Sequence, residues 1–396
     1  MTQRVQDRIS RRNFLAGAAA IAGALPAVRL ATAAAADTRL PAPGRSGLDH
    51  IVVVMMENRS FDHLLGWRKG AYGRQAGLIY FDRDGQPHTT FPLAPDFAGC
   101  AYRDPDHSYG GGRIQYNNGA CDGFLRSGSD LLAIGYYRRR DLPFLGEAAV
   151  HFTVCDRYFC AFMGPTQPNR LYLHAGVTDR MSNAGAASSL PTIWDRLAER
   201  GLRGRYYCSK YPFLAWTWPG KYDSISFPHS RFLSDCRSGN LPHVAYVDPA
   251  FGDNDDHPNE DIRAGESFLY EVYRAVVTSP AWRRTLLVIT FDEWGGFFDH
   301  VPPTIAPDVD PRYALRGFRV PCLLISPFAR RGYVAHGVYD HTSILKMIEW
   351  RWKLAPLSVR DAHARNLALA LDFSRRNLAA PRFDVPAVSA SDCATL

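Results

Sequence analysis

The sequence predicts an α/β fold in which one large, mostly parallel central sheet carries helices on both faces. Two continuous apolar runs, at residues 50–55 and 285–290, have the composition of strands buried inside such a sheet. An amphipathic helical pattern at residues 266–277 leads into the second run, as in a doubly wound sheet. The chain has 396 residues, of which 46% are hydrophobic, so it can bury one large core. We therefore expect a single large domain.

The first predicted strand, at residues 50–55, reads His-Ile-Val-Val-Val-Met and has no polar residue after its first position. A strand with one face in water alternates polar and apolar residues, so this run predicts a central strand covered on both faces. The run at residues 285–290 has the same character, and residues 320–326 are a third candidate strand.

Two further helices are predicted at residues 192–200 and 342–352. Asp340 or His341 is expected to cap the second of these helices. Residues 68–145 are rich in Gly, Asp, Tyr and Arg and show no clear period. We expect them to form a loop-rich insertion over the sheet, where loops commonly control access to a site.

The first 36 residues have the pattern of a removable export signal. An Arg-Arg pair at residues 11–12 precedes Asn-Phe-Leu and a small-residue apolar stretch, which is typical of a twin-arginine signal. The twin-arginine export machinery is therefore an expected partner, and the mature protein is expected in the periplasm, at the cell wall or outside the cell. One predicted domain remains at residues 37–396, with a polar tail at about 375–396.

The net charge of +7 restricts the partners only weakly. The basic residues are scattered, apart from Arg138, Arg139 and Arg140, and no basic stripe is interleaved with aromatic residues. This pattern argues against nucleic-acid binding and favours a role of the charge in solubility. Attraction to anionic membranes or phosphate esters stays open, so a peripheral membrane contact is an alternative.

Eight cysteines fit an oxidising compartment and allow up to four disulfide bonds. None of them has the Cys-x-x-Cys spacing of a zinc knuckle. We therefore expect disulfide bonds or buried thiols, and no metal ligands, among the cysteines.

Acidic side chains follow the first two predicted strands. Glu57 and Asn58 come after the first run, and Asp292 and Glu293 after the second, so a parallel sheet would bring them to one edge. Taken separately, Glu57 and Asn58 could equally well be helix caps, and Asp292 and Glu293 could equally well be a solvated turn, as metal ligands. Together, three carboxylates would repel one another without a cation. We expect a divalent metal ion, and Ca, Mg, Mn, Zn and Fe all suit such ligands with histidines nearby.

A candidate nucleophile stands in the motif Gly-Pro-Thr-Gln-Pro-Asn-Arg at residues 164–170. Two prolines stiffen this turn and place Thr166 at its apex. A threonine hydroxyl is a weak nucleophile, so this role requires a metal ion or a base. The alternative is that Thr166 caps the helix that follows.

Four candidate histidines each follow an acidic residue directly and lie near the motifs above or in a similar cluster, namely His107, His257, His300 and His341. A histidine near a strand end can donate a proton to a departing oxygen. Alone, such a histidine is more often a surface or capping residue. The group of His257, His300 and His341 favours a shared site, and His107 has a weaker claim.

Four motifs, at residues 57–62, 164–170, 291–302 and 340–343, resemble those of the bacterial phospholipase C and acid phosphatase phosphoesterase family in the same order. The resemblance extends over residues 48–352. It implies a phosphoric ester hydrolase whose fold is related to alkaline phosphatases and arylsulfatases.

The resemblance also implies roles for single residues. The metal-binding positions match Glu57, Asn58, Asp292 and Glu293, the nucleophile matches Thr166, and the phosphate-site positions match His107, His257 and His300. The threonine would form a phosphothreonine intermediate, a histidine would protonate the departing alcohol, and water would complete hydrolysis.

Several functions remain open at this stage. A threonine nucleophile favours a phospholipase C that cleaves phosphatidylcholine-like lipids to diacylglycerol and a phosphorylated headgroup. A broad acid phosphatase acting on small phosphate esters is the main alternative, since the chain is shorter than the larger phospholipases of the family. An arylsulfatase-like specificity and a catalytically inactive exported binding protein are the others.

Overall fold

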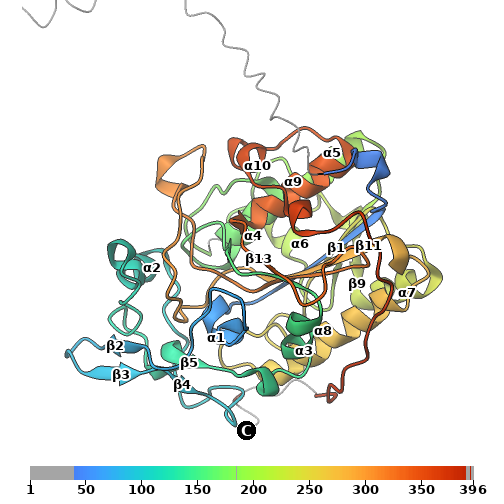
Figure 1. Ribbon diagram of the computed structural model, residues 1–396. Coiled ribbons are helices and arrows are strands. Elements are labelled where there is room, and N and C mark those ends of the chain that lie inside the picture. The colour runs from blue at the N-terminus through green and yellow to red at the C-terminus, as the bar shows by residue number, and fades with distance from the viewer. Residues whose placement is uncertain (1–39, 184, 389–392, 394–396) are drawn as a thin grey trace, which may run out of the picture. The chain divides into compact units, whose positions relative to one another are not determined.

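The computed structural model describes residues 40–183, 185–388 and 393. The export signal predicted at residues 1–36 lies outside these residues. A central sheet of eight strands organises the described chain (Figure 1). In order across the sheet, the strands are β13 (Val334–Ala335), β6 (Thr153–Cys155), β12 (Cys322–Ile325), β11 (Thr285–Phe291), β1 (His50–Met56), β10 (Val244–Val247), β8 (Gly204–Cys208) and β9 (Ser226–Pro228).

The first two predicted strands form the centre of this sheet. β1 and β11 pair in parallel from His50 opposite Thr285 to Met56 opposite Phe291. β10 flanks the other side of β1 and is also parallel to it. All of β11 is buried, and so is all of β1 after His50, which explains why neither run alternates with polar residues. The prediction of buried parallel strands is confirmed.

The third predicted strand is shorter than expected and runs in the opposite direction. β12 pairs antiparallel with β11 on one side and with β6 on the other. The sheet is therefore parallel from β11 to β9 and mixed beyond β11. This arrangement confirms the predicted α/β class with a mostly parallel central sheet.

Helices cover both faces of the sheet, with α4, α5 and α9 on one face and α3, α7 and α8 on the other (Figure 1). The three predicted helices are present as α5, α8 and α9, and the Asp340 side chain caps α9. The α-helices are α1 (Phe61–Leu65), α2 (Tyr109–Tyr116), α3 (Leu145–His151), α4 (Thr166–Ala175), α5 (Ile193–Glu199), α6 (Phe213–Thr217), α7 (His229–Ser238), α8 (Ile262–Val277), α9 (His341–Trp352) and α10 (Val359–His363).

Short elements fill the segments between these layers. Three small sheets pair β2 (Ile79–Phe81) with β3 (Pro87–Thr89), β4 (Phe91–Pro92) with β5 (Gly135–Tyr136), and β7 (Tyr158–Phe159) with β14 (Tyr339–Asp340). The 3-10 helices are Pro43–Arg45, Asn117–Gly119, Leu131–Ile134, Arg139–Asp141, Asp223–Ile225, Trp282–Arg284, Pro311–Tyr313 and Leu367–Ala370. Residues 68–145, the predicted insertion, contain β2 to β5 and α2.

The polar tail packs against the domain. The Phe383 side chain is buried, and the Trp282 indole donates a hydrogen bond of 3.0 Å to the Leu378 carbonyl. Cys393 forms a disulfide bond with Cys100. Across the described ranges, no helix combines the length and the apolar character that crossing a bilayer requires.

Candidate active site

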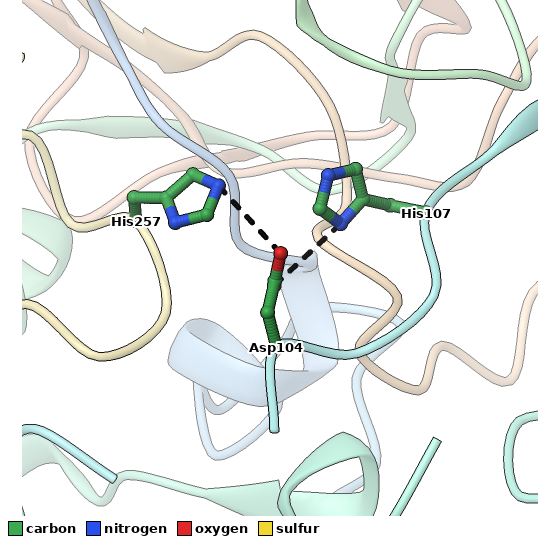
Figure 2. Close-up of side chains that lie close together, drawn as sticks. All are labelled: Asp104, His107 and His257. Atoms are coloured by element: carbon green, nitrogen blue, oxygen red, sulfur yellow. Dashed lines mark ion pairs between the residues drawn. The ribbon is translucent and has the colours of Figure 1, made fainter. Parts of the chain in front are cut away.

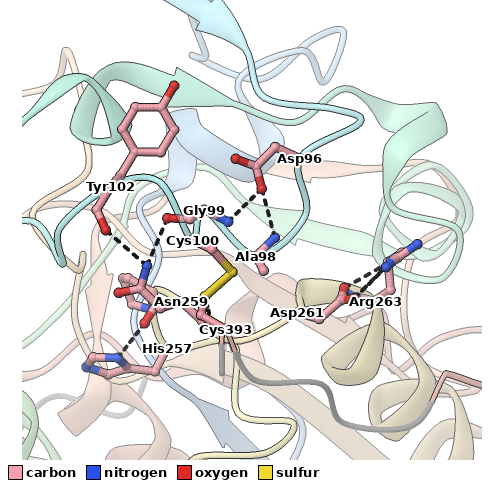
Figure 3. The surroundings of a disulfide bond; sticks show 11 residues. Asp96, Ala98, Gly99, Cys100, Tyr102, His257, Asn259, Asp261, Arg263 and Cys393 are labelled. Carbon is pink, nitrogen blue, oxygen red and sulfur yellow. Dashed lines mark hydrogen bonds and ion pairs between the residues drawn. A yellow bond between two sulfur atoms is a disulfide. The ribbon is translucent and has the colours of Figure 1, made fainter. Parts of the chain in front are cut away.

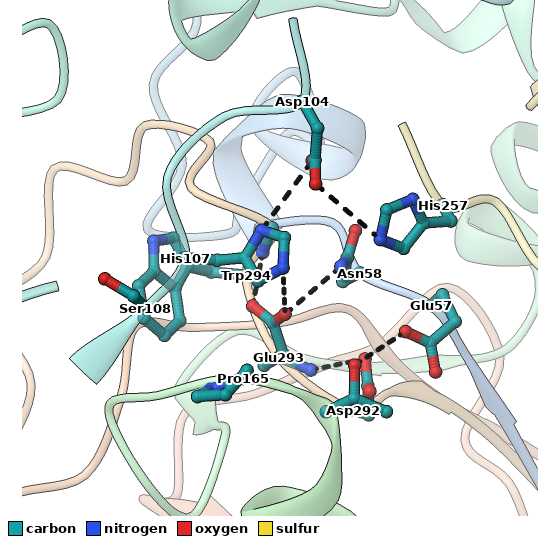
Figure 4. A network of polar contacts seen from close by, with 12 residues as sticks. Glu57, Asn58, Asp104, His107, Ser108, Pro165, His257, Asp292, Glu293 and Trp294 are labelled. Atoms are coloured by element: carbon teal, nitrogen blue, oxygen red, sulfur yellow. Dashed lines mark hydrogen bonds and ion pairs between the residues drawn. The ribbon is translucent and has the colours of Figure 1, made fainter. Parts of the chain in front are cut away.

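The carboxyl ends of β1 and β11 bring the four predicted metal ligands together. The last residues of the two strands, Met56 and Phe291, lie opposite each other, so the residues that follow them begin at the same edge of the sheet. We call these following residues the active-site cluster, and it consists of Glu57, Asn58, Asp292 and Glu293 (Figure 4). All four side chains are buried, with at most 3% of any residue exposed.

Both structural alternatives for the active-site cluster are wrong. The Ser60 side chain caps α1, and the side chains of Glu57 and Asn58 do not. Asp292 and Glu293 are 0% exposed and do not form a solvated turn. The Asn58 amide instead donates a hydrogen bond of 3.1 Å to Oε1 of Glu293, which joins the two strand ends.

Thr166 directs its hydroxyl at this cluster. Thr166 is the first residue of α4, whose N-cap is Pro165, so the capping alternative is wrong. Its Oγ1 donates a hydrogen bond of 2.9 Å to Oε2 of Glu57. The buried Asn169 amide holds the preceding turn by donating to the Gly164 carbonyl at 2.8 Å. The rigid turn predicted from sequence therefore presents the hydroxyl to the acidic side chains.

Arg170 lies one turn after Thr166 and is the central cation of the site. Its Nη2 donates to Oε1 of Glu57 at 2.9 Å, and its Nη1 donates to Oδ1 of Asp248 at 3.0 Å. Its Nε lies 3.6 Å from Oδ2 of Asp292. Burial disfavours the charged guanidinium, but these three acids outweigh it and raise the Arg170 pKa above its ordinary value. One cation is thus shared by three buried carboxyl groups.

The active-site cluster retains an excess of acid that fits a divalent metal ion. Burial, reinforced by the charge of Glu57, raises the pKa of Asp292 and of Glu293 well above the ordinary range. Oδ1 of Asn58 and Oδ2 of Asp292 are buried without a hydrogen-bond donor among the described residues. A hard cation would coordinate the buried oxygen atoms that lack donors, and its charge would favour ionisation of the neighbouring carboxyl groups.

Two of the predicted histidines lie beside the cluster, on either side of Asp104 (Figure 2). One ligand atom each of Asp104, His107 and His257 lies within 4.8 Å of the others. Both histidines direct Nδ1 to a neighbouring backbone carbonyl, at 2.9 Å for His107 and 3.1 Å for His257. A carbonyl only accepts, so each ring carries a proton on Nδ1, which leaves Nε2 available for other contacts. Nε2 of His107 is 3.8 Å from Oε1 of Glu293.

A cavity of about 260 Å³ opens beside Thr166. One wall is aromatic, because the lining includes Phe213, Trp216 and Phe251, and Trp216 stacks on Phe251 with a centroid separation of 6.0 Å. Trp216 is 49% exposed. The charged and titratable residues of the lining are Glu57, Asp255, His257 and Glu260.

The structure places His300 in a different cluster, which we call the paired cluster and which consists of Asp62, Asp299, His300 and Arg319. Nδ1 of His300 lies 2.5 Å from Oδ2 of Asp62. Arg319 donates to Asp299 at 2.9 Å and to Asp62 at 3.0 Å. The catalytic role expected of His300 remains a prediction, and these contacts give it no support.

His341 supports the backbone of the site. Its Nε2 donates a hydrogen bond of 2.6 Å to the Asp292 carbonyl, and the Tyr158 hydroxyl lies 3.1 Å from its Nδ1. Burial lowers the His341 pKa to about 4, so the ring is neutral at pH 7. It holds the strand end that carries Asp292.

Sequence analysis gave no role to Arg170, Asp248 or Asp104. Arg170 ends the motif at residues 164–170, and its spacing from Thr166 on a helix would have placed the two side chains on one face. Asp248 follows β10, so the strand-end argument used for Asp292 applies to it equally. No local pattern indicates that Asp104 meets the histidines.

A disulfide bond fastens the loop that carries Asp104 (Figure 3). Cys100 in this loop is bonded to Cys393, whose Sγ contacts the Asn259 carbonyl at 3.3 Å. The Asn259 amide donates to two backbone carbonyls of the same loop, at 2.9 and 3.3 Å. The loop is thereby tied to the segment that carries His257. The remaining six cysteines are buried thiols, as sequence analysis allowed.

The chain matches the Phosphoesterase family over residues 48–355. It belongs to this family. The match confirms the resemblance drawn from the four motifs, and it makes the chain a phosphoric ester hydrolase. The donor-free oxygen atoms of the active-site cluster are compatible with a divalent metal ion in this Phosphoesterase member.

Named relatives include phospholipases C from bacteria and plants. Phospholipase C B of Mycobacterium tuberculosis strain H37Rv is 31% identical over 472 aligned residues, which cover 97% of this chain and 90% of that protein. Non-specific phospholipase C1 of Arabidopsis thaliana is 33% identical over 79% of this chain and 69% of its own length. Among solved structures, an alkaline phosphatase superfamily protein from Vibrio parahaemolyticus aligns with 83% of this chain and 71% of its own, at 9% identity and a TM-score of 0.42.

Proposed function

We propose that this Phosphoesterase member is an exported, metal-dependent phospholipase C that cleaves phosphatidylcholine-like lipids to diacylglycerol and a phosphorylated headgroup. The observation that carries the proposal is the Thr166 hydroxyl, which lies 2.9 Å from Glu57 at the edge of a buried acidic cluster and beside a cavity. The names of the relatives support the reaction class. The twin-arginine signal at residues 11–12 supports export.

Thr166 is the nucleophile in this proposal. Glu57 accepts the hydrogen bond of the hydroxyl and orients Oγ1 toward the cavity that receives the phosphate. A divalent ion held by the active-site cluster would stabilise negative charge on the phosphate oxygens and on the threonine oxygen. As Oγ1 attacks, the hydroxyl proton passes to Glu57, the bond to phosphorus forms and the bond to the diacylglycerol oxygen breaks, which leaves phosphothreonine.

His257, protonated on Nε2, is the proton donor to the departing alcohol. It lines the cavity together with Thr166, and its Nδ1 is occupied by a backbone carbonyl, so Nε2 is the nitrogen that exchanges protons. After the alcohol leaves, the same Nε2 takes a proton from water that attacks the phosphothreonine. Hydrolysis releases the phosphorylated headgroup, and Glu57 returns its proton to the Thr166 oxygen.

The cavity lining favours a cationic headgroup. Trp216 presents an exposed ring over the cavity, and the nearby lining includes the carboxyl groups of Asp255 and Glu260. A quaternary ammonium group binds well over a tryptophan face and near carboxylates. A cavity of about 260 Å³ lies below the roughly 300–1,000 Å³ of sites for drug-sized ligands, so it suits a headgroup and not two acyl chains.

The test compares p-nitrophenylphosphorylcholine with p-nitrophenyl phosphate, using the purified mature protein and its Thr166→Ala variant before and after EDTA. We expect cleavage of the choline ester that EDTA abolishes and that the variant loses by at least about 10³-fold. Preference for the monoester would identify a phosphatase instead. Turnover of neither ester, with each of Ca, Mg, Mn and Zn restored, would leave a binding protein.

The aromatic wall has its own test in Trp216→Leu, which retains apolar bulk but removes the π face. We expect kcat/KM for the choline ester to fall about tenfold while the value for p-nitrophenyl phosphate is unchanged. An equal fall for both esters would mean that Trp216 shapes the site without recognising the headgroup.

A further inference from the structure

A second, larger cavity, of about 730 Å³, lies between the C-terminal end of α1 and the segment after β5. Its lining includes four arginines, at positions 74, 138, 139 and 140, and the only acid among the described lining residues is Glu147. The lining also contains Trp67 and Tyr136. None of these residues belongs to the active-site cluster or to the cavity beside Thr166.

The positive charge of this cavity is poorly compensated by the protein. Glu147 is bound by Arg139 through two hydrogen bonds of 3.0 Å. Among the residues that the structure describes, Arg74 and Arg138 have no ion-pair partner. Arg140 is 76% exposed at its side chain and lies 3.7 Å from Asp141. Three guanidinium groups are therefore available to an external anion.

An exposed apolar surface lies next to the cavity. In β2, Ile79 and Phe81 point to one side and are 57% and 48% exposed, while Tyr80 points inward and packs on Phe124. Tyr72, which directly precedes the lining residue at position 73, is 62% exposed. The lining residue at position 76 is three residues before Ile79, so their Cα atoms are at most about 11 Å apart.

We propose that this surface, formed by Arg74, Arg138, Arg140, Tyr72, Ile79 and Phe81, docks the protein on an anionic lipid bilayer. The arginines complement the negative surface potential of acidic lipids. The exposed aromatic and aliphatic side chains enter the interface between headgroups and acyl chains, where such side chains gain free energy. A soluble anion would use the arginines and leave the apolar side chains in water, so the combination favours a bilayer.

The test is cosedimentation with vesicles of phosphatidylcholine alone and of phosphatidylcholine containing about 30% phosphatidylglycerol, an anionic lipid. A Thr166→Ala background keeps the vesicles intact. We expect binding to the anionic vesicles that weakens as NaCl is raised. Since each basic side chain at an anionic surface contributes about fivefold to binding, the Arg138→Glu, Arg140→Glu variant should bind at least about 25-fold more weakly.

A matched control is the Arg237→Glu, Arg283→Glu variant, which makes the same charge change at two exposed arginines on other elements. It should bind within about twofold of the parent protein. Phe81→Ser should also weaken vesicle binding while leaving its salt dependence unchanged. In an active background, all of these surface variants should cleave p-nitrophenylphosphorylcholine as the parent does, which shows that they fold.

Three results would overturn the proposal. The first is equal vesicle binding by the Arg138→Glu, Arg140→Glu variant and the control variant. The second is equal binding to neutral and anionic vesicles. The third is calorimetric binding of inorganic phosphate that the arginine variant loses, without any vesicle binding, which would identify a soluble-anion site. Because binding is measured without turnover, each result is independent of whether the phospholipase proposal holds.

Discussion

Two clusters of acids follow the same pair of central strands, yet they differ in how their charges are compensated. In the paired cluster, Arg319 donates to both Asp62 and Asp299, and every carboxylate oxygen of these two residues accepts a hydrogen bond. In the active-site cluster, two buried oxygens have no donor among the described residues, and burial raises the pKa of Asp292 and Glu293 well above the ordinary range, whereas the pKa of Asp299 in the paired cluster is raised to about 6. The first arrangement is complete within the protein, and the second is compatible with an external cation.

The comparison shows that sequence proximity to a strand end does not by itself define a catalytic residue. His300 and Asp292 follow the same strand, but Nδ1 of His300 is bound to Asp62, whereas Oδ2 of Asp292 has no hydrogen-bond donor among the described residues. What separates them is whether the polar groups already have partners. Polar groups without partners are available to a ligand, whereas paired groups hold the fold.

The largest expected effect is on stability in the paired cluster. Arg319→Met would leave Asp62 and Asp299 buried without their cation, which we expect to cost about 3–5 kcal/mol in the free energy of unfolding. Urea denaturation measures this loss. The matched control is Arg312→Met, which removes an arginine from an ion pair with Asp310 whose side chains are 67% and 26% exposed. That change should leave the free energy of unfolding nearly unchanged, and equal losses would mean that the paired cluster does not hold the fold.

A smaller effect separates the two histidines that sequence analysis treated alike. His257→Gln should lower kcat/KM for phosphatidylcholine about 10²-fold, or about 2.7 kcal/mol, because the alkoxide of diacylglycerol leaves poorly without a proton. The same variant should lose much less on p-nitrophenylphosphorylcholine, since p-nitrophenolate leaves without protonation. Steady-state kinetics on both substrates measures the difference.

His300→Gln is the control for this pair. It should change kcat/KM for either substrate by no more than about threefold, because His300 contacts Asp62 and not the cavity residues. A loss on phosphatidylcholine that matches that of His257→Gln would restore His300 to the catalytic residues and break the comparison.

The smallest effect concerns pH and the metal ion. In metal-free protein, the folded state holds protons on Asp292 and Glu293 more tightly than the unfolded chain, because their pKa values are raised. Their contribution to stability is therefore present at low pH. It is lost as pH rises above about 4 through the raised pKa values. A divalent ion binds the ionised form, so it should stabilise the protein most at the higher pH.

Thermal unfolding of chelated protein at pH 5 and pH 8, with and without Mn²⁺, measures this dependence. The Asp292→Asn, Glu293→Gln variant should lose both the pH-dependent fall and the stabilisation by metal. If the metal-free parent protein loses no more stability between pH 5 and pH 8 than this variant does, the assignment of excess acid to the cluster is wrong.

The central strands and the ligand positions could be predicted because local sequence records them. A continuous run such as residues 50–55 shows burial on both faces, and the parallel-sheet rule then places Glu57 near Asp292. The direction of β12 could not be predicted, since its apolar run is compatible with either orientation. The segment that connects β11 to β12 decides the direction of β12, and the sequence of that segment has no repeating pattern.

The partners of the histidines were beyond sequence reasoning for a different reason. His257 meets Asp104, and His300 meets Asp62, through segments that lie far apart in the chain. An acid directly before each histidine was visible, but it is not the acid that each histidine contacts. Arg170 could have been assigned, because it stands four residues after Thr166 in the same helix.

The disulfide bond between Cys100 and Cys393 makes the attachment of the Asp104 loop depend on the redox state of the compartment. The two cysteines are 293 residues apart in sequence. Because a disulfide bond forms only where an oxidant is present, the covalent attachment of the loop that carries Asp104 depends on the compartment. In a reducing cytoplasm, the loop would rely on hydrogen bonds such as those from the Asn259 amide. In the exported phospholipase C proposed above, this covalent constraint would form only after export.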